Sequence, residues 1–253
     1  MSDHGEASDV DDTAPLTLLA VTHGAPSSEN RAAVISLVDA IAGERPALDV
    51  GISFVDAQHT DVAVALAQRM HAPGAVIVPL VLSAGFHVRA GLRKGLERIE
   101  GRGGSLAEPL GPDDRIVSVL AERLEQAGML PGDSVVLAAA GSRDARAVRE
   151  CFETGRRLGA RLGRPVTVGF IAAAIPRLPD AIEMVREVHP GSRVIVAAYL
   201  LAPGHFNDAV RTAGADLVAE PLVSLTTTVP VELVRLVIER YDDARAQRAR
   251  ITA

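Results

Sequence analysis

The chain is 253 residues long, 48% of these are hydrophobic, and its formal net charge of −6 argues against a nucleic-acid partner, which leaves a basic footprint. This length and this hydrophobic content suffice for one large domain or two ordinary ones with a substantial core. The single cysteine, Cys151, excludes an intramolecular disulfide and a thiolate-cluster metal site, and we expect it to be a buried structural thiol on a helix.

Residues 1–14 are small, polar and acidic, and they are expected to form a disordered tail. They lack the positive region and the apolar region of a secretory signal peptide. No apolar run in the chain approaches the roughly 18 residues of a membrane span, so no membrane partner is expected. Together with the cysteine count, these features predict a cytoplasmic protein.

The next part of the chain alternates strand and helix patterns. Short apolar runs predict buried strands at 16–22, 50–57 and 74–85, followed by a strand-like segment at 105–111. Helical spacing predicts a helix over 27–43, capped by Ser27 or Ser28, and further helices from about Asp61 and over 92–99. Alternating strands and helices favour a parallel sheet that helices cover on both faces.

From Ser134 the same order of patterns recurs. SVVLAAAGSRD is similar to LTLLAVTHGAP, VTVGFIAA to VGISFVDA, SRVIVAAYLLAPG to GAVIVPLVLSAG, and LVAEPLVS to SLAEPLGP. A helix is predicted over 145–163, and the chain closes with an amphipathic helix over 229–249. Repetition of one supersecondary unit indicates a duplication; a chance likeness of apolar strands is the alternative.

The sequence therefore predicts an α/β fold of two duplicated, doubly wound parallel-sheet units with helices on both faces. We place the N-terminal unit at 15–127 and the C-terminal unit, a degenerate copy, at 132–243. Residues 244–253 include three arginines and are predicted to fray into solvent.

Polar side chains follow the predicted strands of the N-terminal unit. His23 follows the first strand, Asp56 lies near the end of the second, and His87 follows the third. Because ligands of open parallel sheets bind outside the carboxyl ends of the strands, we expect these side chains on one rim. A neutral imidazole is both a ligand for a borderline divalent ion and a base near neutral pH. Structural hydrogen bonding by the histidines and helix capping by Asp56 are the alternatives.

The corresponding positions of the C-terminal unit are apolar, and they are occupied by Ala140, Ala172 and Phe206. His205 is one place off the alignment and is expected to face differently. One active half and one supporting half is the simplest account, and it places the metal site in the N-terminal unit.

Motifs of other enzyme classes are absent from the sequence. No GxxxxGKS or GxxxxGKT loop is present, so the use of a nucleoside triphosphate is not expected, and no GxGxxG follows the first strand. The absence of a GxSxG elbow counts against an α/β-hydrolase-like enzyme. Residues 141–144, GSRD, are interpreted as a capped strand–helix turn, with an anion site at the helix start as the alternative.

THGAPS after the first strand, PLVLSAGFHVR after the third, and AEPLGPD near the end of the first half resemble the sirohydrochlorin chelatases of the class II chelatase family. The resemblance extends from about Leu16 to Tyr241. It implies a lyase that inserts a divalent metal ion into a sirohydrochlorin-type tetrapyrrole without ATP. The metal ion is then a substrate, and the resemblance implies no permanently bound cofactor.

The resemblance also implies roles for single residues. The two histidines of the family fall on His23 and His87, which would bind the ion and assist deprotonation of the macrocycle. An acidic residue at the end of the family's second strand falls on Asp56, which would orient a partner or add charge. Phe86 would cover a face of the ring. The basic residues expected at the substrate's carboxylates are Arg89, Arg93 and Lys94, for which solvated helix positions are the alternative.

The sequence departs from the family pattern at three points. FVD stands where FLE is frequent, so the carboxylate of Asp56 is one methylene shorter. HGA replaces HGS, so Ala25 lacks the hydroxyl, and residues 90–92, Ala-Gly-Leu, replace Asp-Ile-Pro. These changes are expected to shift substrate preference or to weaken activity, but they remove neither histidine.

The identity of the metal remains open at this point. Fe²⁺ for sirohaem is favoured and Co²⁺ for cobalamin is the alternative, because imidazole suits several first-row ions. A non-catalytic tetrapyrrole- or metal-binding protein is a further alternative. The chain is expected to be a monomer or a homodimer. The roles of His59 and His205 are left unassigned.

Overall fold

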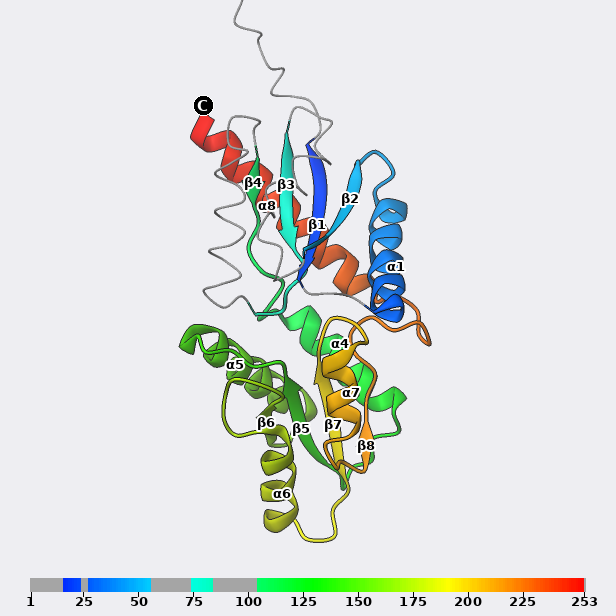
Figure 1. The fold of residues 1–253 in the computed structure, drawn as a ribbon, viewed down its shortest axis with the longest axis vertical. Coiled ribbons are helices and arrows are strands. Elements are labelled where there is room, and N and C mark those ends of the chain that lie inside the picture. The colour runs from blue at the N-terminus through cyan, green and yellow to red at the C-terminus, as the bar shows by residue number, and fades with distance from the viewer. Residues whose placement is uncertain (1–15, 24–26, 56–73, 84–103, 253) are drawn as a thin grey trace, which may run out of the picture.

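The protein, here a computed structural model that describes residues 16–23, 27–55, 74–83 and 104–252, contains two four-stranded parallel sheets. The sheets follow one another along the long axis of the molecule (Figure 1). The first has the strand order β2-β1-β3-β4 and the second β6-β5-β7-β8. Each strand number in the second order is four higher than the number at the same place in the first order, so the two halves share one topology. The predicted duplicated α/β fold is thereby confirmed.

The strands of the first sheet are β1 (Thr17–His23), β2 (Val50–Val55), β3 (Ala75–Pro79) and β4 (Ser105–Leu106). Those of the second sheet are β5 (Ser134–Ala139), β6 (Val166–Phe170), β7 (Val194–Tyr199) and β8 (Leu217–Val218). The helices are α1 (Ser28–Glu44), α4 (Asp114–Gln126), α5 (Ala145–Leu162), α6 (Leu178–Val188), α7 (His205–Arg211) and α8 (Val231–Thr252). β3 is shorter than predicted, because the chain leaves the ladder after Leu80, whose N–H donates to Val21 O.

The second sheet is buried on both faces, as its continuous apolar strands predict. Successive side chains of a strand point to opposite faces, and those of β5 divide accordingly. Val135 and Leu137 join the core formed with α4 and α5, whereas Val136 and Ala138 join the core formed with α6. Helices therefore cover both faces of this sheet.

Two helices pack on the sheet of the opposite half. α4 follows β4 in the chain but contacts α5 and β7, and α8 follows β8 but contacts β3, β4 and α1. Figure 1 shows α8 crossing the first sheet. Each sheet is covered by one helix from the other half of the chain. The predicted division into units at 15–127 and 132–243 therefore stays a prediction. One hydrophobic core consequently runs through both halves.

The last helix is held by side-chain contacts to the first half. The hydroxyl of Tyr241 donates to Leu16 O at 2.6 Å, and the guanidinium of Arg45 pairs with Asp242 at 2.7 Å. Residues 244–253 were expected to fray, but α8 stays helical to Thr252, and Ala244 is buried. Among the described helices, α8 included, none is long and apolar enough to cross a bilayer.

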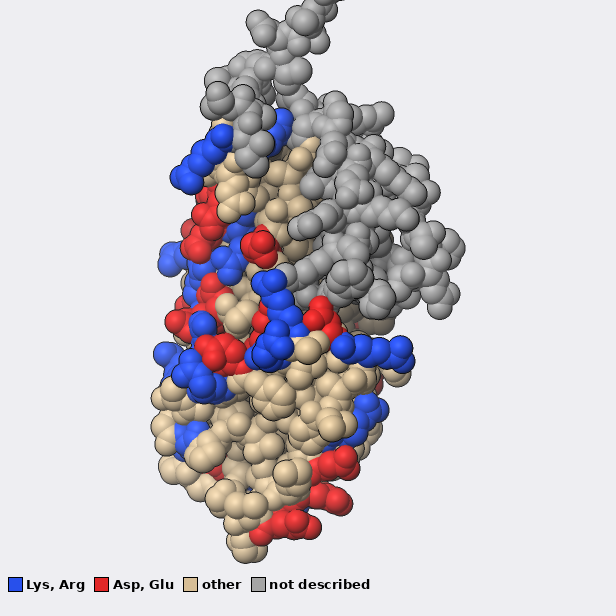
Figure 2. All heavy atoms as spheres, turned by 90° about the vertical axis from the view of Figure 1, so that its left-hand side faces the viewer, with Lys and Arg blue, Asp and Glu red and all other residues tan. Residues whose placement is uncertain are grey.

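Charged side chains also connect the halves. Arg115 at the start of α4 pairs with Glu239 of α8 at 2.7 Å and with Asp113, which caps α4, at 2.9 Å. In Figure 2, basic and acidic side chains lie interspersed over the middle of the visible face. The pair of Arg115 and Glu239 joins α4 of the first half to α8 of the second half.

Candidate functional site

The carboxyl ends of the two sheets face each other across a cavity of about 420 Å³. Its described lining comes from the segments that follow β1, β3, β5 and β7, together with the first turns of α1 and α7 and one residue of α5. Ligands of parallel sheets bind at this edge, because loops diverge there and backbone groups are left unpaired. Both halves therefore contribute to one cavity, although the sequence analysis placed the site in the N-terminal unit.

The first half supplies the end of β1 and the chain after β3. Thr22 lines the cavity one residue before His23, the last residue of β1, whose backbone pairs with Val55 of β2. Ser27 lines the cavity as well and caps α1 by accepting a hydrogen bond from Asn30 N at 3.1 Å, as predicted. Thr22, just before residues 23–26, and Ser27, just after them, therefore both line the cavity.

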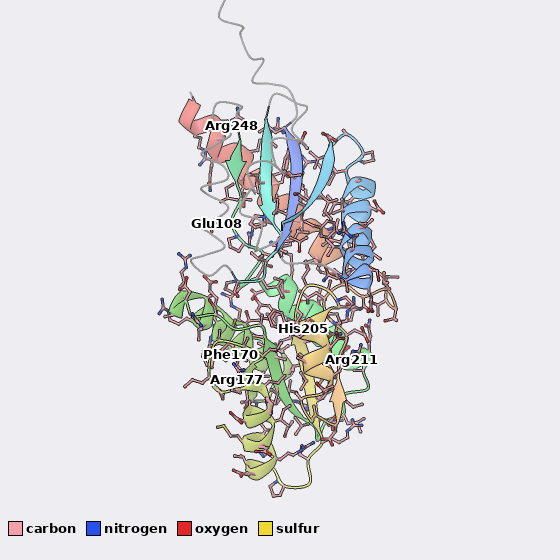
Figure 3. All side chains as sticks on the ribbon, in the orientation of Figure 1. Glu108, Phe170, Arg177, His205, Arg211 and Arg248 are labelled. Atoms are coloured by element: carbon pink, nitrogen blue, oxygen red, sulfur yellow. The ribbon has the colours of Figure 1, made fainter. Side chains whose placement is uncertain are left out.

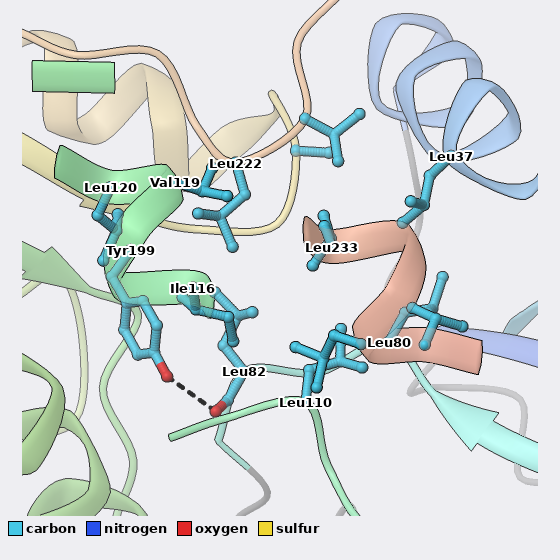
Figure 4. Close-up of a cluster of buried hydrophobic side chains, with 14 of the residues drawn as sticks. Leu37, Leu80, Leu82, Leu110, Ile116, Val119, Leu120, Tyr199, Leu222 and Leu233 are labelled. Carbon is cyan, nitrogen blue, oxygen red and sulfur yellow. Dashed lines mark hydrogen bonds between the residues drawn. The ribbon is translucent and has the colours of Figure 1, made fainter. Parts of the chain in front are cut away.

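Tyr199, the last residue of β7, forms a hydrogen bond across the two halves. It is 3% exposed, and its hydroxyl donates to Leu82 O at 2.9 Å (Figure 4). Burial raises the pKa of Tyr199 well above its usual range, so the phenol stays neutral and can act as a donor. An added Cβ at Gly111 would lie 2.4 Å from both Leu82 O and the Tyr199 hydroxyl, so only glycine fits at this crossing.

Cys151 lines the same cavity and is 3% exposed, which confirms the predicted buried thiol. Its Sγ lies 3.9 Å from Ser83 Oγ. Burial raises the pKa of the Cys151 thiol to about 11. The thiol is therefore protonated near neutral pH, and it is poorly suited to act as a nucleophile or a metal ligand.

The segment between β7 and α7 is tied to the first half. Asn30 of α1 donates through Nδ2 to Pro203 O at 2.7 Å. Gly204 follows with φ of 145°, a backbone conformation that favours glycine, and α7 begins at His205. His205 lines the cavity at the end of α7 that lies nearer the first sheet (Figure 3). Its ring centroid lies 6.0 Å from that of Phe206, which lines the cavity too.

Asn207, in the first turns of α7, is a buried polar residue of the cavity wall. It is 3% exposed, and its Oδ1 has no hydrogen-bond partner among the described residues. A buried acceptor without a donor costs free energy, so native proteins seldom retain one.

The described lining includes no Asp, Glu, Lys or Arg side chain, and most of it is apolar. Among the described residues no group of three or more His, Cys, Asp and Glu side chains is arranged to hold a metal ion. This part of the cavity suits a largely apolar ligand body, and charged groups of such a ligand would need partners outside the described lining.

Most of the predicted site residues lie outside the described residues. His23 is described only as the last position of β1, without its side chain. The other predicted site residues, all outside the described ranges, are Asp56, Phe86, His87, Arg89, Arg93 and Lys94, and the unassigned His59 lies outside these ranges too. Their roles stay predictions.

The sequence analysis missed the polar contribution of the second half. Tyr199 and Asn207 were not singled out, and His205 was noted only as one place off the alignment. The available signal was the match of APGHF to SAGFH, which indicated that this loop occupies the same rim. The expected capped turn at 141–144 is confirmed, because Asp144 caps α5 by accepting from Arg146 N at 2.8 Å.

The sequence matches known proteins over nearly its whole described length. The family model CbiX matches twice, over residues 17–127 and over 134–240. The sirohydrochlorin cobaltochelatase of Sulfolobus acidocaldarius is 30% identical over 118 residues, which cover 46% of this chain and 96% of that protein. The sirohydrochlorin ferrochelatase of Priestia megaterium is 28% identical over 135 residues, which cover 51% of this chain and 50% of that protein.

A shorter match is to the sirohydrochlorin cobaltochelatase of Sulfurisphaera tokodaii, which is 43% identical over 51 residues. It covers 20% of this chain and 42% of that protein, so the chain spans less than half of the length of this relative. Among solved structures, SirB from Bacillus subtilis with Fe³⁺ superimposes with a TM-score of 0.75 at 19% identity, covering 92% of this chain and 98% of that one. At this identity the likeness confirms the fold alone.

Proposed function

The chain belongs to the CbiX family, and from that premise we propose that it inserts a divalent metal ion into a sirohydrochlorin-type tetrapyrrole. The observation that carries the proposal is the largely apolar cavity between the carboxyl ends of the two sheets, next to the β1 end that bears His23. The curated relatives named above are sirohydrochlorin chelatases, which supports this substrate class.

The reaction exchanges protons for a metal ion. A free-base macrocycle holds two N–H protons, and both must leave as the divalent ion binds the four ring nitrogens. We assign His23 and His87 to hold the incoming ion and to accept a proton, since a neutral imidazole does either near pH 7. Asp56 would orient one imidazole or add negative charge. No step requires ATP.

The walls of the cavity suit the body of the macrocycle. Aliphatic residues such as Leu80 and Leu200 line it, and burial of an apolar ring face against them stabilises binding by roughly 25 cal/mol per Å². Because no charged side chain belongs to the described lining, we assign the substrate's carboxylates to the basic residues Arg89, Arg93 and Lys94, and a ring face to Phe86.

The identity of the metal belongs to the proposal. We favour Fe²⁺, and hence sirohaem synthesis, with Co²⁺ and cobalamin synthesis as the alternative. The solved relatives are described with Fe³⁺ and with cobalt, so they do not separate the two. We further propose a cytoplasmic monomer or homodimer, since a single buried cysteine requires no oxidising compartment.

The decisive experiment incubates the purified protein anaerobically with sirohydrochlorin and Fe²⁺, Co²⁺ or Ni²⁺, each added alone and then in competition. Metal insertion changes the absorption spectrum of the macrocycle, and its rate is compared with the rate without protein. We expect acceleration, largest with Fe²⁺. A spectral shift on binding with no faster insertion would instead favour the non-catalytic carrier, which the HGA and Ala-Gly-Leu departures make a specific alternative.

A further inference from the structure

Two neighbouring aromatic side chains of the second half, His205 and Phe206, line the cavity. We infer that this aromatic pair binds one face of the tetrapyrrole macrocycle and thereby selects a flat, conjugated ring as the substrate. The inference rests on the proposed function, since it names the part of that substrate to which the second half binds.

Both rings of the aromatic pair are accessible to a ligand. Three residues with aromatic rings belong to the described lining, and the third, Tyr199, is only 3% exposed. Phe206 is 42% exposed, and His205 is exposed as well. A ligand in the cavity can therefore reach these two rings, whereas the ring of Tyr199 is covered by protein.

The geometry of the aromatic pair suits contact with a further ring system. The two ring centroids are 6.0 Å apart, and the ring planes make an angle of 41°. This separation lies within the range of roughly 4.5–7 Å over which aromatic rings attract one another. A macrocycle that stacks on Phe206 would meet the ring of His205 at an angle. Stacked and tilted contacts between aromatic rings stabilise binding beyond the burial of apolar area alone.

The backbone holds the aromatic pair in place without a ligand. The preceding segment is bonded to the first half from Asn30 Nδ2 to Pro203 O at 2.7 Å. The helix that carries both rings, α7, is anchored by Val210, which is fully buried in the core that it shares with Val194 of β7. Side chains on an anchored helix lose little further freedom when a ligand binds, so more of the contact energy appears as affinity.

Exposure of an aromatic ring would not by itself support this inference, because single exposed apolar side chains are common on protein surfaces. Phe152 of α5 illustrates this: it is 44% exposed but does not belong to the described lining, and its ring centroid lies 5.6 Å from that of Phe170. The aromatic pair differs, because its two accessible rings are adjacent and both line the cavity at the carboxyl ends of the sheets.

The proposed reaction leaves the faces of the macrocycle intact. Metal insertion replaces two N–H protons at the centre of the ring, so substrate and product offer the aromatic pair similar conjugated faces. An interaction that is equally strong throughout a reaction lowers KM without raising kcat. A porphyrinogen with carboxylate side chains is the informative contrast, because saturated bridges join its four rings, which are then not coplanar. Such a ligand can reach the carboxylate partners, but it cannot stack on the aromatic pair.

The experiment replaces the rings and uses a phenylalanine of similar exposure as the matched control. Phe206→Ala removes the ring, Phe206→Leu keeps apolar bulk without a ring, and Phe206→Tyr keeps the ring. His205→Phe keeps a ring and removes the imidazole nitrogens. Phe152→Ala is the control, because Phe152 lies outside the described lining. Isothermal titration calorimetry under anaerobic conditions gives the dissociation constants of sirohydrochlorin, its Co²⁺ complex and the porphyrinogen. Circular dichroism checks folding, and Phe206→Leu carries the test if Phe206→Ala does not fold.

We expect Phe206→Ala to raise the dissociation constants of sirohydrochlorin and of its Co²⁺ complex by the same factor. This factor should be roughly five- to a hundredfold, the effect of removing an aromatic side chain on which a flat base stacks. KM for sirohydrochlorin should rise with it, while kcat changes far less. Phe206→Leu should have a smaller effect, and Phe206→Tyr and His205→Phe should retain most of the affinity because they keep a ring. Binding of the porphyrinogen should not respond to Phe206→Ala.

Several results would overturn the inference. They are an unchanged dissociation constant of sirohydrochlorin in Phe206→Ala, an equal increase in Phe152→Ala, and an equal increase for the porphyrinogen. A lower kcat in His205→Phe would overturn it as well, because the imidazole would then take part in the chemistry.

The inference and the proposed function fail in different ways. A wild-type protein that metallates sirohydrochlorin, combined with unchanged binding by Phe206→Ala, overturns only the role of the aromatic pair. A wild-type protein that does not bind sirohydrochlorin overturns the proposed function together with this inference.

Discussion

The two halves of the molecule share a strand order, but they end differently at the cavity. In the first half, β1 ends at His23, and the next described residue, Ser27, caps α1 at the cavity wall. In the second half, β5 ends at Ala139, and the following chain is closed by backbone bonds from Ile171 N to Ala139 O and from Ala172 N to Ala140 O. The first half thus has a titratable residue at the end of its first strand, whereas the second half has Ala140 at the corresponding position.

The comparison shows that the two halves contribute different kinds of residues to the cavity. The second half has Ala140 where the first half has His23, and it supplies Tyr199, His205 and Asn207 to the cavity wall. Tyr199 and Asn207 can shape a binding site without competing for the metal ion as strongly as a second set of charged ligands would. We therefore expect chemistry to depend on the first half, and geometry and selectivity to depend on the second.

The most direct way to break this comparison is to remove the imidazoles of the first half. We expect His23→Ala and His87→Ala each to lower kcat/KM for metal insertion by about 10²–10⁴-fold, the usual contribution of a positioned acid–base group, with little change in stability. His189→Ala is the matched control, because that residue is an exposed helix C-cap on α6. Undiminished turnover in either first-half variant would refute the division.

A second prediction concerns the bond that joins the halves at the cavity. Tyr199→Phe leaves Leu82 O without its donor, and we expect the free energy of unfolding to fall by about 1–3 kcal/mol in urea denaturation. Tyr241→Phe is the control, because its hydroxyl is bonded to Leu16 O outside the cavity. Both variants should lose stability, but only Tyr199→Phe should weaken binding of the tetrapyrrole. Equal binding by the two variants would show that the bond is purely structural.

A smaller effect is expected at the contact between α1 and the β7–α7 segment. Asn30→Ala removes the bond to Pro203 O, worth about 0.5–1.5 kcal/mol, and should raise KM for the tetrapyrrole by roughly two- to tenfold. Ser36→Ala removes a bond within α1 to Ala33 O and serves as the control. A KM that is insensitive to Asn30 would mean that the second half holds its loop unaided.

The smallest effect is a pH dependence of the second sheet. The Arg193 guanidinium holds the pKa of Asp133 below its ordinary value of 3.8, and Leu130 N–H, which also donates to this carboxylate, acts in the same direction. Because the folded pKa is the lower one, this pair stabilises the fold above pH 3.8, and its contribution is lost as the pH falls through the lowered pKa. Unfolding measured between about pH 6 and pH 3 should show this loss in the wild type and less of it in Asp133→Asn.

The strands and their order along the chain could be predicted from the sequence because each is a short apolar run between turns. The partners of the helices could not. The pattern of α8 indicates one buried face, but it does not say whether that face meets the second sheet, as chain order suggests, or β3 and β4, as found. The amphipathic pattern of a helix predicts which of its faces is buried, but it does not predict which apolar surface that face covers.

Within the site, sequence reasoning reached the residues at strand ends and missed those placed by backbone geometry. His205 was set aside because the alignment offsets it by one position from the matching histidine of the first half. The turn at Gly204, with φ of 145°, redirects the chain at that point, and His205 lines the cavity. The buried amide of Asn207 carries no sequence signature, since its significance depends on a missing partner.

The exchange of α4 and α8 means that neither half is a self-sufficient module. A fragment that stops after residue 126 would expose the faces of β3 and β4 that α8 covers, while its own last helix would lack the β7 and α5 surface on which it packs. Such a fragment has a helix without a surface to pack on and a sheet without its covering helix. In two copies placed head to head, the last helix of each copy could cover the sheet of the other, as in domain swapping.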